Sequence, residues 1–307
     1  MSNTTVQISL TLRDYIRSER LPTTWCAGCG LGIILNAIVQ AVIHTGLEKD
    51  DITMVSGIGC TGRMSGYVDF NTVHTTHGRA PAFATGIKMA QPDMNVITVM
   101  GDGDAMSIGG NHLVHAMRRN IGMVALVVNN SVYGLTGGQA SPTTPVGGIA
   151  TTAPIGTFER PMDLEALART AGAPFFARTT VNHTANMVKV IERAFRVPGF
   201  ALIEVISNCH VIYGKMNGMP EATDMIAAMD DDTVRTNPAL IRRGNLPVRH
   251  TAAGATTSET LLTLNGVHKP EPSGRGILWE DTGSREFSAQ YHTRAKKLAL
   301  AANGGSS

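Results

Sequence analysis

Apolar runs alternate along the chain with segments in which apolar residues recur at helical spacing. The runs that predict buried strands lie at 51–57, 95–100, 123–128, 174–177 and 200–207. The segments that predict helices lie at 31–43, 82–90, 108–120, 163–171, 183–196 and 286–302, with Ser107 as the expected N-cap of the third. Strand and helix in regular alternation predict an α/β fold with a doubly wound, mostly parallel sheet.

The character of the sequence changes near both ends of this pattern. Residues 1–24 mix charged and apolar positions and are predicted to be an N-terminal extension without the apolar core of a signal peptide. Residues 25–230 carry the alternating pattern and are predicted to be one domain. Residues 231–307 contain several arginines and a Gly/Pro-rich stretch. We expect this last part to be an extended C-terminal arm that packs on the domain or on a partner subunit.

Composition limits the classes of protein to which the chain can belong. Hydrophobic residues make up 43% and charged residues 16%, which is typical of a compact soluble protein. The net charge of +2 favours no polyanionic partner, so we expect no nucleic acid. The longest apolar helix, 31–43, is too short to span a bilayer, so we expect no membrane contact. Four cysteines without a secretion signal suggest a cytoplasmic setting.

Polar side chains follow two of the predicted strands at the point where each strand ends. One strand ends in Gly101-Asp102-Gly103-Asp104, and the next ends in Asn129-Asn130. Parallel strands bring their carboxyl ends to one edge of a sheet, where such folds bind ligands. Asp102 and Asn130 supply the oxygen ligands that Mg²⁺ prefers, and Mg²⁺ in proteins is usually completed by phosphate groups. The sequence therefore predicts a magnesium and phosphate site.

The four cysteines lie in turns and at a strand end. Cys26 and Cys29 form a Cys-x-x-Cys turn, Cys60 lies in a glycine-rich loop after the first strand, and Cys209 follows the strand at 200–207. Buried free thiols, a redox pair, a zinc half-site and an iron–sulfur half-site all fit the turn. The position of Cys60 in a ligand-approach loop favours a shared metal site.

Two further loops are candidates for ligand contact. His74 and His77 lie before the helix at 82–90, and we interpret them as polar contacts to phosphate or substrate. The alternative is that they are structural loop residues whose hydrogen bonds are made within the protein. The stretch 134–145 consists of small residues without hydrophobic periodicity. Long loops of this kind are often functional, so we expect it to cover the reacting atoms.

Together these residues resemble a known family. Gly101-Asp102-Gly103 followed by Asn129-Asn130 resembles the signature of Mg²⁺–thiamine diphosphate enzymes. With Trp25-Cys26-Ala27-Gly28-Cys29-Gly30, Gly57-Ile58-Gly59-Cys60, His77-Gly78-Arg79 and Cys209, the chain looks like the β subunit of a 2-oxoacid:ferredoxin oxidoreductase. Within this family, three motifs look most like the 2-oxoglutarate type, namely Gly101-Asp102-Gly103-Asp104, Arg118-Arg119-Asn120 and the stretch 136–145.

The resemblance implies a thiamine-diphosphate-binding fold of the diphosphate-binding type and a defined set of site residues. Cys26, Cys29, Cys60 and Cys209 would bind one [4Fe–4S] cluster. Asp102, Asn130 and the Val132 carbonyl would bind Mg²⁺, and Leu135 and Thr136 would lie near the thiazolium and the substrate. The residues that would hold thiamine diphosphate are Ile58, Gly59, Thr61, His77, Gly101, Asp102, Gly103, Asp104, Asn130, Val132 and Gly134.

The implied activity is the coenzyme A-dependent oxidative decarboxylation of 2-oxoglutarate to succinyl-CoA and CO2, or its reverse, with electrons passed through the cluster to ferredoxin. Thiamine enzymes also need a carboxylate beside the aminopyrimidine, usually from a second domain of similar fold. The chain is long enough for only the diphosphate-binding half. We therefore expect an α subunit to supply that Glu and much of the substrate pocket, in a heterotetramer of two α and two β subunits.

Three alternatives stay open. The stretch 135–145 contains no Lys or Arg for a distal carboxylate, so pyruvate or a branched-chain 2-oxoacid is a possible substrate. A non-oxidative thiamine decarboxylase, such as a sulfopyruvate-type β subunit, would need no set of four cysteines. A non-catalytic α/β subunit would use the four cysteines to hold a structural metal such as zinc.

Overall fold

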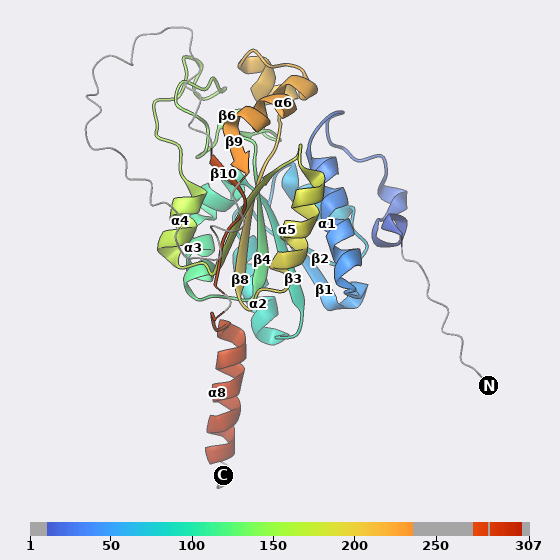
Figure 1. The fold of residues 1–307 in the computed structure, drawn as a ribbon, viewed down its shortest axis with the longest axis vertical. Helices are drawn as coiled ribbons and strands as arrows, with labels where there is room; N and C mark the ends of the chain where they lie inside the picture. The colour runs from blue at the N-terminus through green and yellow to red at the C-terminus, as the bar shows by residue number, and fades with distance from the viewer. Residues whose placement is uncertain (1–10, 236–272, 282, 303–307) are drawn as a thin grey trace, which may run out of the picture.

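A computed structural model describes residues 11–235, 273–281 and 283–302 of the chain (Figure 1). Its main sheet has eight strands in the spatial order β2-β1-β3-β4-β8-β7-β10-β9, and β10 is antiparallel to β7 while the other neighbours are parallel. The strands of this sheet are β1 (Ile52–Ser56), β2 (Asn71–His74), β3 (Asn95–Gly101), β4 (Met123–Asn129), β7 (Phe175–Thr180), β8 (Phe200–Ile206), β9 (Thr233–Arg235) and β10 (Ser273–Glu280). The predicted doubly wound, mostly parallel fold is confirmed.

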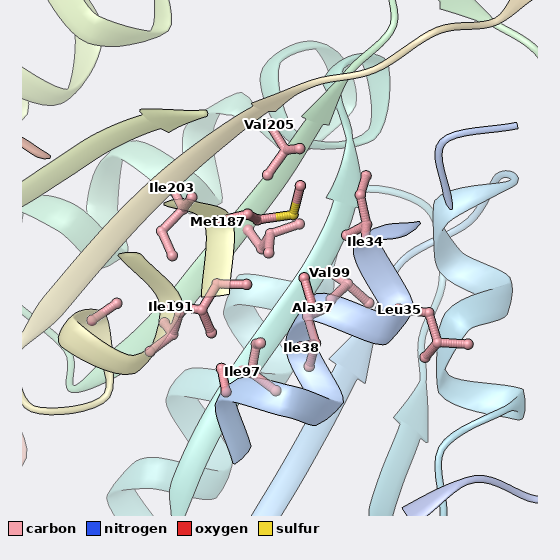
Figure 2. Packing of buried hydrophobic residues seen from close by; sticks show 14 of the residues in the cluster. Ile34, Leu35, Ala37, Ile38, Ile97, Val99, Met187, Ile191, Ile203 and Val205 are labelled. Carbon is pink, nitrogen blue, oxygen red and sulfur yellow. The ribbon is translucent and has the colours of Figure 1, made fainter. Parts of the chain in front are cut away.

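Helices cover both faces of the sheet, which explains why its central strands read as continuous apolar runs. In β3, Ile97 and Val99 belong to the apolar cluster under α1 and α5, whereas Val96 and Met100 belong to the cluster on the opposite face. Figure 2 shows the first cluster, in which α1, carrying Ile34 and Ile38, packs against α5, carrying Met187 and Ile191. The helices are α1 (Leu31–Thr45), α2 (Ala80–Ala90), α3 (Gly110–Arg118), α4 (Leu164–Ala171), α5 (Thr184–Ala194), α6 (Ala222–Asp232) and α8 (Phe287–Ala302).

The order of the strands fixes where a ligand can bind. From β1 the chain crosses to β2 at one edge of the sheet, and it then returns to continue through β3 and β4 on the other side of β1. This reversal between β1 and β3 is a topological switch point, and open α/β sheets bind ligands beside such points at the carboxyl ends of the strands. The loops after β1 and β3 carry the predicted site residues.

Two local predictions are wrong. Ser107 is not an N-cap, because the chain turns through a π-helical segment, Asp104–Ile108, and α3 begins only at Gly110 after Gly109. The stretch 134–145 is not without secondary structure, because β6 (Gln139–Ala140) pairs antiparallel with β5 (Val132–Tyr133). The π-helical segment is a feature that often marks functional sites.

The two predicted extensions both contact the domain where they are described. Tyr15, from residues 1–24, is 2% exposed and belongs to the core beside α1. In the C-terminal arm, β10 joins the sheet beside β7, and α8 projects away from it (Figure 1). The rest of the predicted arm, 236–272 and 303–307, lies outside the described residues, and so does most of its arginine-rich stretch. No helix among the described residues has the length and apolar character to cross a membrane.

Candidate cofactor site

A pocket opens at the switch point, between the ends of β1, β3 and β4. Every residue predicted to hold thiamine diphosphate or magnesium lines it, together with Leu135 and Thr136. Cys60 and Tyr133 also line it. The predicted residues that line the pocket are Ile58, Gly59, Thr61, His77, Gly101, Asp102, Gly103, Asp104, Asn130, Val132, Gly134, Leu135 and Thr136. Residues from four separate loops, which the family resemblance had named together, therefore line one pocket.

Glycines at three positions shape the wall of this pocket. Gly59 has φ +117°, a conformation that favours glycine, and a Cβ there would point into open space. A Cβ on Gly57 would lie 1.7 Å from Oδ2 of Asp104, and a Cβ on Gly103 would lie 2.1 Å from the ring of Tyr133. The backbone at Gly59 can therefore come close to a bulky ligand, while Gly57 and Gly103 admit the side chains behind it.

Asp102 is the most buried acidic group of the pocket, with 2% of its surface exposed. The hydroxyls of Ser141 (2.7 Å) and Thr143 (2.5 Å) contact its Oδ2 oxygen. Burial raises the pKa of Asp102, and the two hydroxyls oppose this shift. Because both hydroxyls hold Oδ2, a cation in the pocket is expected to bind through Oδ1.

Asp104 is also 2% exposed, and its carboxylate accepts hydrogen bonds from groups in the wall of the pocket. Its charge is therefore not presented to a phosphate. Its Oδ1 accepts hydrogen bonds from the Gly78 amide (2.7 Å) and the Ile58 amide (3.4 Å), and it contacts Nδ1 of His77. With Nδ1 turned to Asp104, the Nε2 atom of His77 is the ring nitrogen that can meet a ligand. The other carboxylate oxygen of Asp104, Oδ2, is buried and has no hydrogen-bond partner among the described residues.

The turn after β4 presents the other predicted magnesium ligands. Ser131 has φ +61°, in the left-handed region that residues other than glycine rarely adopt. The Thr144 hydroxyl donates to the Ser131 carbonyl (2.7 Å), and the Asn130 side chain accepts from the Val132 amide at 3.3 Å. Strained backbone of this kind is concentrated at functional sites, where the surroundings hold it in place. The turn brings both Asn130 and Val132 to the wall of the pocket.

The four cysteines gather beside the pocket and form no disulfide. Burial, together with the charges of the other three thiols, raises the pKa of Cys29 to about 11. Burial and neighbouring thiols likewise raise the pKa of Cys60, and the same holds for Cys209. Buried thiols that repel one another's charge fit a cationic metal group, which would stabilise all four as thiolates.

Hydrogen bonds connect the segments that carry these thiols. The Cys29 amide donates to the Cys26 carbonyl (3.0 Å), and Asn208, next to Cys209, donates to the Gly28 carbonyl (2.9 Å). The indole of Trp25 donates to the Cys60 carbonyl at 2.8 Å. The turn before α1, the loop after β1 and the end of β8 are thereby joined to one another.

No set of three or more His, Cys, Asp or Glu residues within the described part of the chain is arranged to hold a single metal ion. The [4Fe–4S] cluster and the zinc alternative both stay predictions.

The cysteine group and the pocket share a wall. Cys60 lines the pocket, and so does Gly134. A Cβ on Gly134 would lie 3.4 Å from the sulfur of Cys209 and 3.8 Å from that of Cys60. The predicted cluster and the predicted thiamine site are thus adjacent, which is the arrangement that electron transfer between them requires.

Sequence reasoning missed the residues behind the pocket. Ser141 and Thr143 were included in a covering loop, yet their side chains hold Asp102. Ser141-Pro142-Thr143-Thr144 follows closely on the Asn-Asn strand end, which is the one signal that could have indicated the contact. Tyr133, whose hydroxyl donates to the Gly103 carbonyl (3.3 Å), was also missed.

Comparison with known proteins identifies the family to which the chain belongs. Residues 57–205 match the model of the thiamine pyrophosphate enzyme C-terminal TPP-binding domain. The 2-oxoglutarate synthase subunit KorB of Methanothermobacter marburgensis is 46% identical over 226 residues, which cover 74% of this chain and 79% of the relative. The chain belongs to the family of 2-oxoacid:ferredoxin oxidoreductase β subunits.

Other members of this β-subunit family agree with the assignment. The subunit KorB of Archaeoglobus fulgidus is 55% identical over 196 residues, covering 64% of this chain and 73% of the relative. A structure of 2-oxoglutarate:ferredoxin oxidoreductase from Magnetococcus marinus, with 2-oxoglutarate, coenzyme A and succinyl-CoA bound, superposes with a TM-score of 0.77. It is 30% identical and covers 94% of this chain and 91% of that chain. The family predicted from the sequence motifs is confirmed.

Proposed function

We propose that this chain is the thiamine diphosphate-binding β subunit of a 2-oxoglutarate:ferredoxin oxidoreductase. The complete enzyme would convert 2-oxoglutarate and coenzyme A into succinyl-CoA and CO2, or run the reaction in reverse, and exchange electrons with ferredoxin. The observation that carries this proposal is the wall at Cys60 and Gly134, which a thiamine-type pocket and a four-thiol group share. The oxidative reaction needs both groups side by side.

Different residues of the pocket would hold different parts of the cofactor. Asp102, Asn130 and the Val132 carbonyl would bind Mg²⁺, whose charge would neutralise the diphosphate. His77 and the loop at Ile58 and Gly59 would hold the phosphate oxygens. Thiamine diphosphate, when bound, supplies a carbon nucleophile and a sink for the electrons released on decarboxylation.

The cysteines would hold the electron acceptor. Cys26, Cys29, Cys60 and Cys209 provide the four thiolates that a [4Fe–4S] cluster needs. Cys26 is the exposed member of the four, while the other three are half-buried. The cluster, when bound, would accept electrons one at a time, and the exposed side at Cys26 would face the surface where ferredoxin can approach.

The substrate assignment rests on several relatives named for 2-oxoglutarate and on a neighbour that holds 2-oxoglutarate and coenzyme A. Leu135 and Thr136 lie at the mouth of the pocket, and Leu135 is 45% exposed. The hydroxyl of Thr136 contacts the Gln139 side chain at 2.5 Å. The stretch 135–145 contains no cation, so the distal carboxylate of 2-oxoglutarate would be held by Thr136, by loop amides or by the partner subunit.

The partner subunit is proposed because the pocket lacks a free acid. Among the described residues that line it, the acidic ones are Asp102 and Asp104, and both already hold structural partners. An α subunit would supply the Glu for the aminopyrimidine. The loop after β6 carries two apolar side chains, Ile155 (83% exposed) and Phe158 (82% exposed), which are suited to contact such a subunit. The assembly we propose contains two α and two β subunits.

The experiment is an assay of the anaerobically purified complex with a viologen dye as electron acceptor. We expect brown protein with iron and thiamine diphosphate in proportion to the β subunit. We also expect coenzyme A-dependent dye reduction that is fastest with 2-oxoglutarate. Equal or faster reduction with pyruvate or branched-chain 2-oxoacids would overturn the substrate assignment. Active protein without iron would indicate a non-oxidative decarboxylase, and colourless, zinc-containing, inactive protein would indicate a non-catalytic subunit.

A further inference from the structure

A buried ion pair joins β8, which lies next to β4 in the sheet, to β7 on the far side of β8. Arg178 of β7 and Glu204 of β8 are paired in register, and the Arg178 Nε atom donates to Oε2 of Glu204 at 2.6 Å. Their side chains are 7% and 5% exposed. Arg178 also contacts Glu165 of α4 at 3.0 Å, and that side chain is 30% exposed. Burying a charged pair carries a desolvation cost that often exceeds its attraction, so its place in the core calls for an explanation beyond stability.

The inner end of this pair fixes the side chain of Asn129. The Nδ2 atom of Asn129 donates to Oε1 of Glu204 at 2.9 Å. A carboxylate only accepts hydrogen bonds, so the NH2 end of the amide must face Glu204 and its oxygen, Oδ1, must face the other way. The contact between Nε of Arg178 and Oε2 of Glu204 holds Glu204 in place. The ion pair therefore determines that the oxygen of Asn129 faces Ser131 and Thr143.

The oxygen of Asn129 contacts both sides of the proposed cation site. It accepts from the amide of Ser131 (3.3 Å), the residue whose strained turn presents Asn130 and Val132. It also contacts the hydroxyl of Thr143 at 2.9 Å, and Thr143 contacts Oδ2 of Asp102. The single proton of Thr143 serves one of these acceptors or is shared between them, and in either case Thr143 joins Asn129 to Asp102.

We propose that Glu204 and Arg178 are positioning residues for the cation of the cofactor site. They orient Asn129. Asn129 then holds Thr143 against Asp102, and it also holds Ser131 in the turn after β4. Glu204, Arg178, Asn129 and Thr143 do not line the pocket, so they act through the ligands and not on the cation itself. The inference rests on the proposed function, because it assumes that Mg²⁺ binds with thiamine diphosphate at Asp102.

The test measures Mn²⁺ as the probe cation. The full-length chain, in complex with its α subunit and stripped of metal and cofactor, is titrated with Mn²⁺ in the presence of thiamine diphosphate. Free Mn²⁺ is followed by electron paramagnetic resonance. We expect Glu204→Gln to weaken Mn²⁺ binding by about 10-fold to 100-fold, which is the usual effect of losing a group that orients metal ligands. Glu165→Gln is the matched control, because it removes a carboxylate from Arg178 without touching Asn129, and we expect binding to stay within about 2-fold.

A second pair of variants keeps the test decisive if Glu204→Gln does not fold. Thr143→Val removes the hydroxyl at nearly constant volume, and we expect the same loss of Mn²⁺ affinity. Thr143→Ser restores the hydroxyl, and we expect it to restore binding. Unchanged Mn²⁺ affinity in folded Glu204→Gln or in Thr143→Val would overturn the inference. If the unmodified complex binds no Mn²⁺ with thiamine diphosphate, the proposed function fails instead.

Discussion

Two carboxylates, one at each end of the parallel strands, both accept hydrogen bonds from backbone amides, but their pKa values shift in opposite directions. Asp104, at the carboxyl edge, accepts from the amides of Gly78 and Ile58. Glu286, at the amino edge, accepts from the amides of Gly122 (2.8 Å), Ser288 (2.9 Å) and Ala289 (2.7 Å). Burial outweighs the donors and raises the pKa of Asp104. Burial also acts to raise the pKa of Glu286, but the donors more than offset it and the pKa is lowered.

The opposite pKa shifts indicate that Asp104 is kept for function and Glu286 for stability. A charge with a raised pKa is held at a cost to folding, so the carboxyl edge keeps Asp104 because of what it positions. A charge with a lowered pKa stabilises the fold, and Glu286 attaches the start of α8 to the loop before β4. The amino edge has its own cavity, lined in part by Lys88, Gly122 and Glu286, but it lies at the end of the sheet opposite the candidate residues.

The largest expected effect tests whether the carboxyl edge is one site or two. Cys29→Ser removes one of the four thiols without touching the pocket lining. We expect the iron content and the brown absorbance to be lost, and dye reduction with them, while thiamine diphosphate still binds with its affinity within about 2-fold. Iron analysis and cofactor titration measure the two outcomes. Loss of thiamine diphosphate binding would show that the two groups form a single unit.

Asp104→Asn tests the cost of the charge at the carboxyl edge. The amide keeps an acceptor for Gly78 but weakens the hold on His77, so we expect thiamine diphosphate binding to fall by about 10-fold. Removing a buried charge should leave the unfolding temperature of the cofactor-free protein unchanged or higher. Titration calorimetry and thermal unfolding check the two expectations. A large drop in unfolding temperature would contradict the comparison of the two edges.

Glu286→Ala tests the opposite edge and has the smallest expected effect. Loss of the cap on α8 should lower the free energy of unfolding by about 1 kcal/mol at pH 7 and leave thiamine diphosphate binding unchanged. Because the folded-state pKa lies below the reference value of 4.5, the stabilisation is present above that pH and is lost as the pH falls through the folded-state pKa. Denaturant unfolding at pH 7 and pH 4 should therefore show a smaller difference at pH 4. An equal difference at both pH values would exclude the charge as the cause.

Sequence reasoning located the strands that are covered on both faces and the residues at their ends. The run at 95–100 coincides with β3 because nearly every position in it is buried. By contrast, β2 is half-exposed and polar, and β10 is glycine-rich, so neither has an apolar pattern of its own. These two strands form because a neighbouring strand offers hydrogen-bonding groups, which is a property of the fold and not of the segment.

The same distinction applies to the site. Strand ends carry a local signal, since an apolar run breaks into Gly and Asp, and that signal identified Asp102 and Asn130. The other predicted pocket residues came from the resemblance to a known family. The contacts of Thr143 with Asp102 and of Asn129 with Glu204 join segments far apart in the sequence. A hydroxyl or amide in such a contact looks like any other loop or strand residue, so only the folded arrangement reveals it.

The antiparallel strand β10 has a consequence for how the chain is made. It pairs with β7 although almost a hundred residues separate the two strands in the sequence. A ribosome that has released everything up to β8 has therefore delivered the whole cofactor pocket, but one flank of β7 still lacks its partner. An unpaired flank of a strand invites pairing with other chains. The domain is therefore prone to aggregate until β10 has been synthesised and has paired with β7.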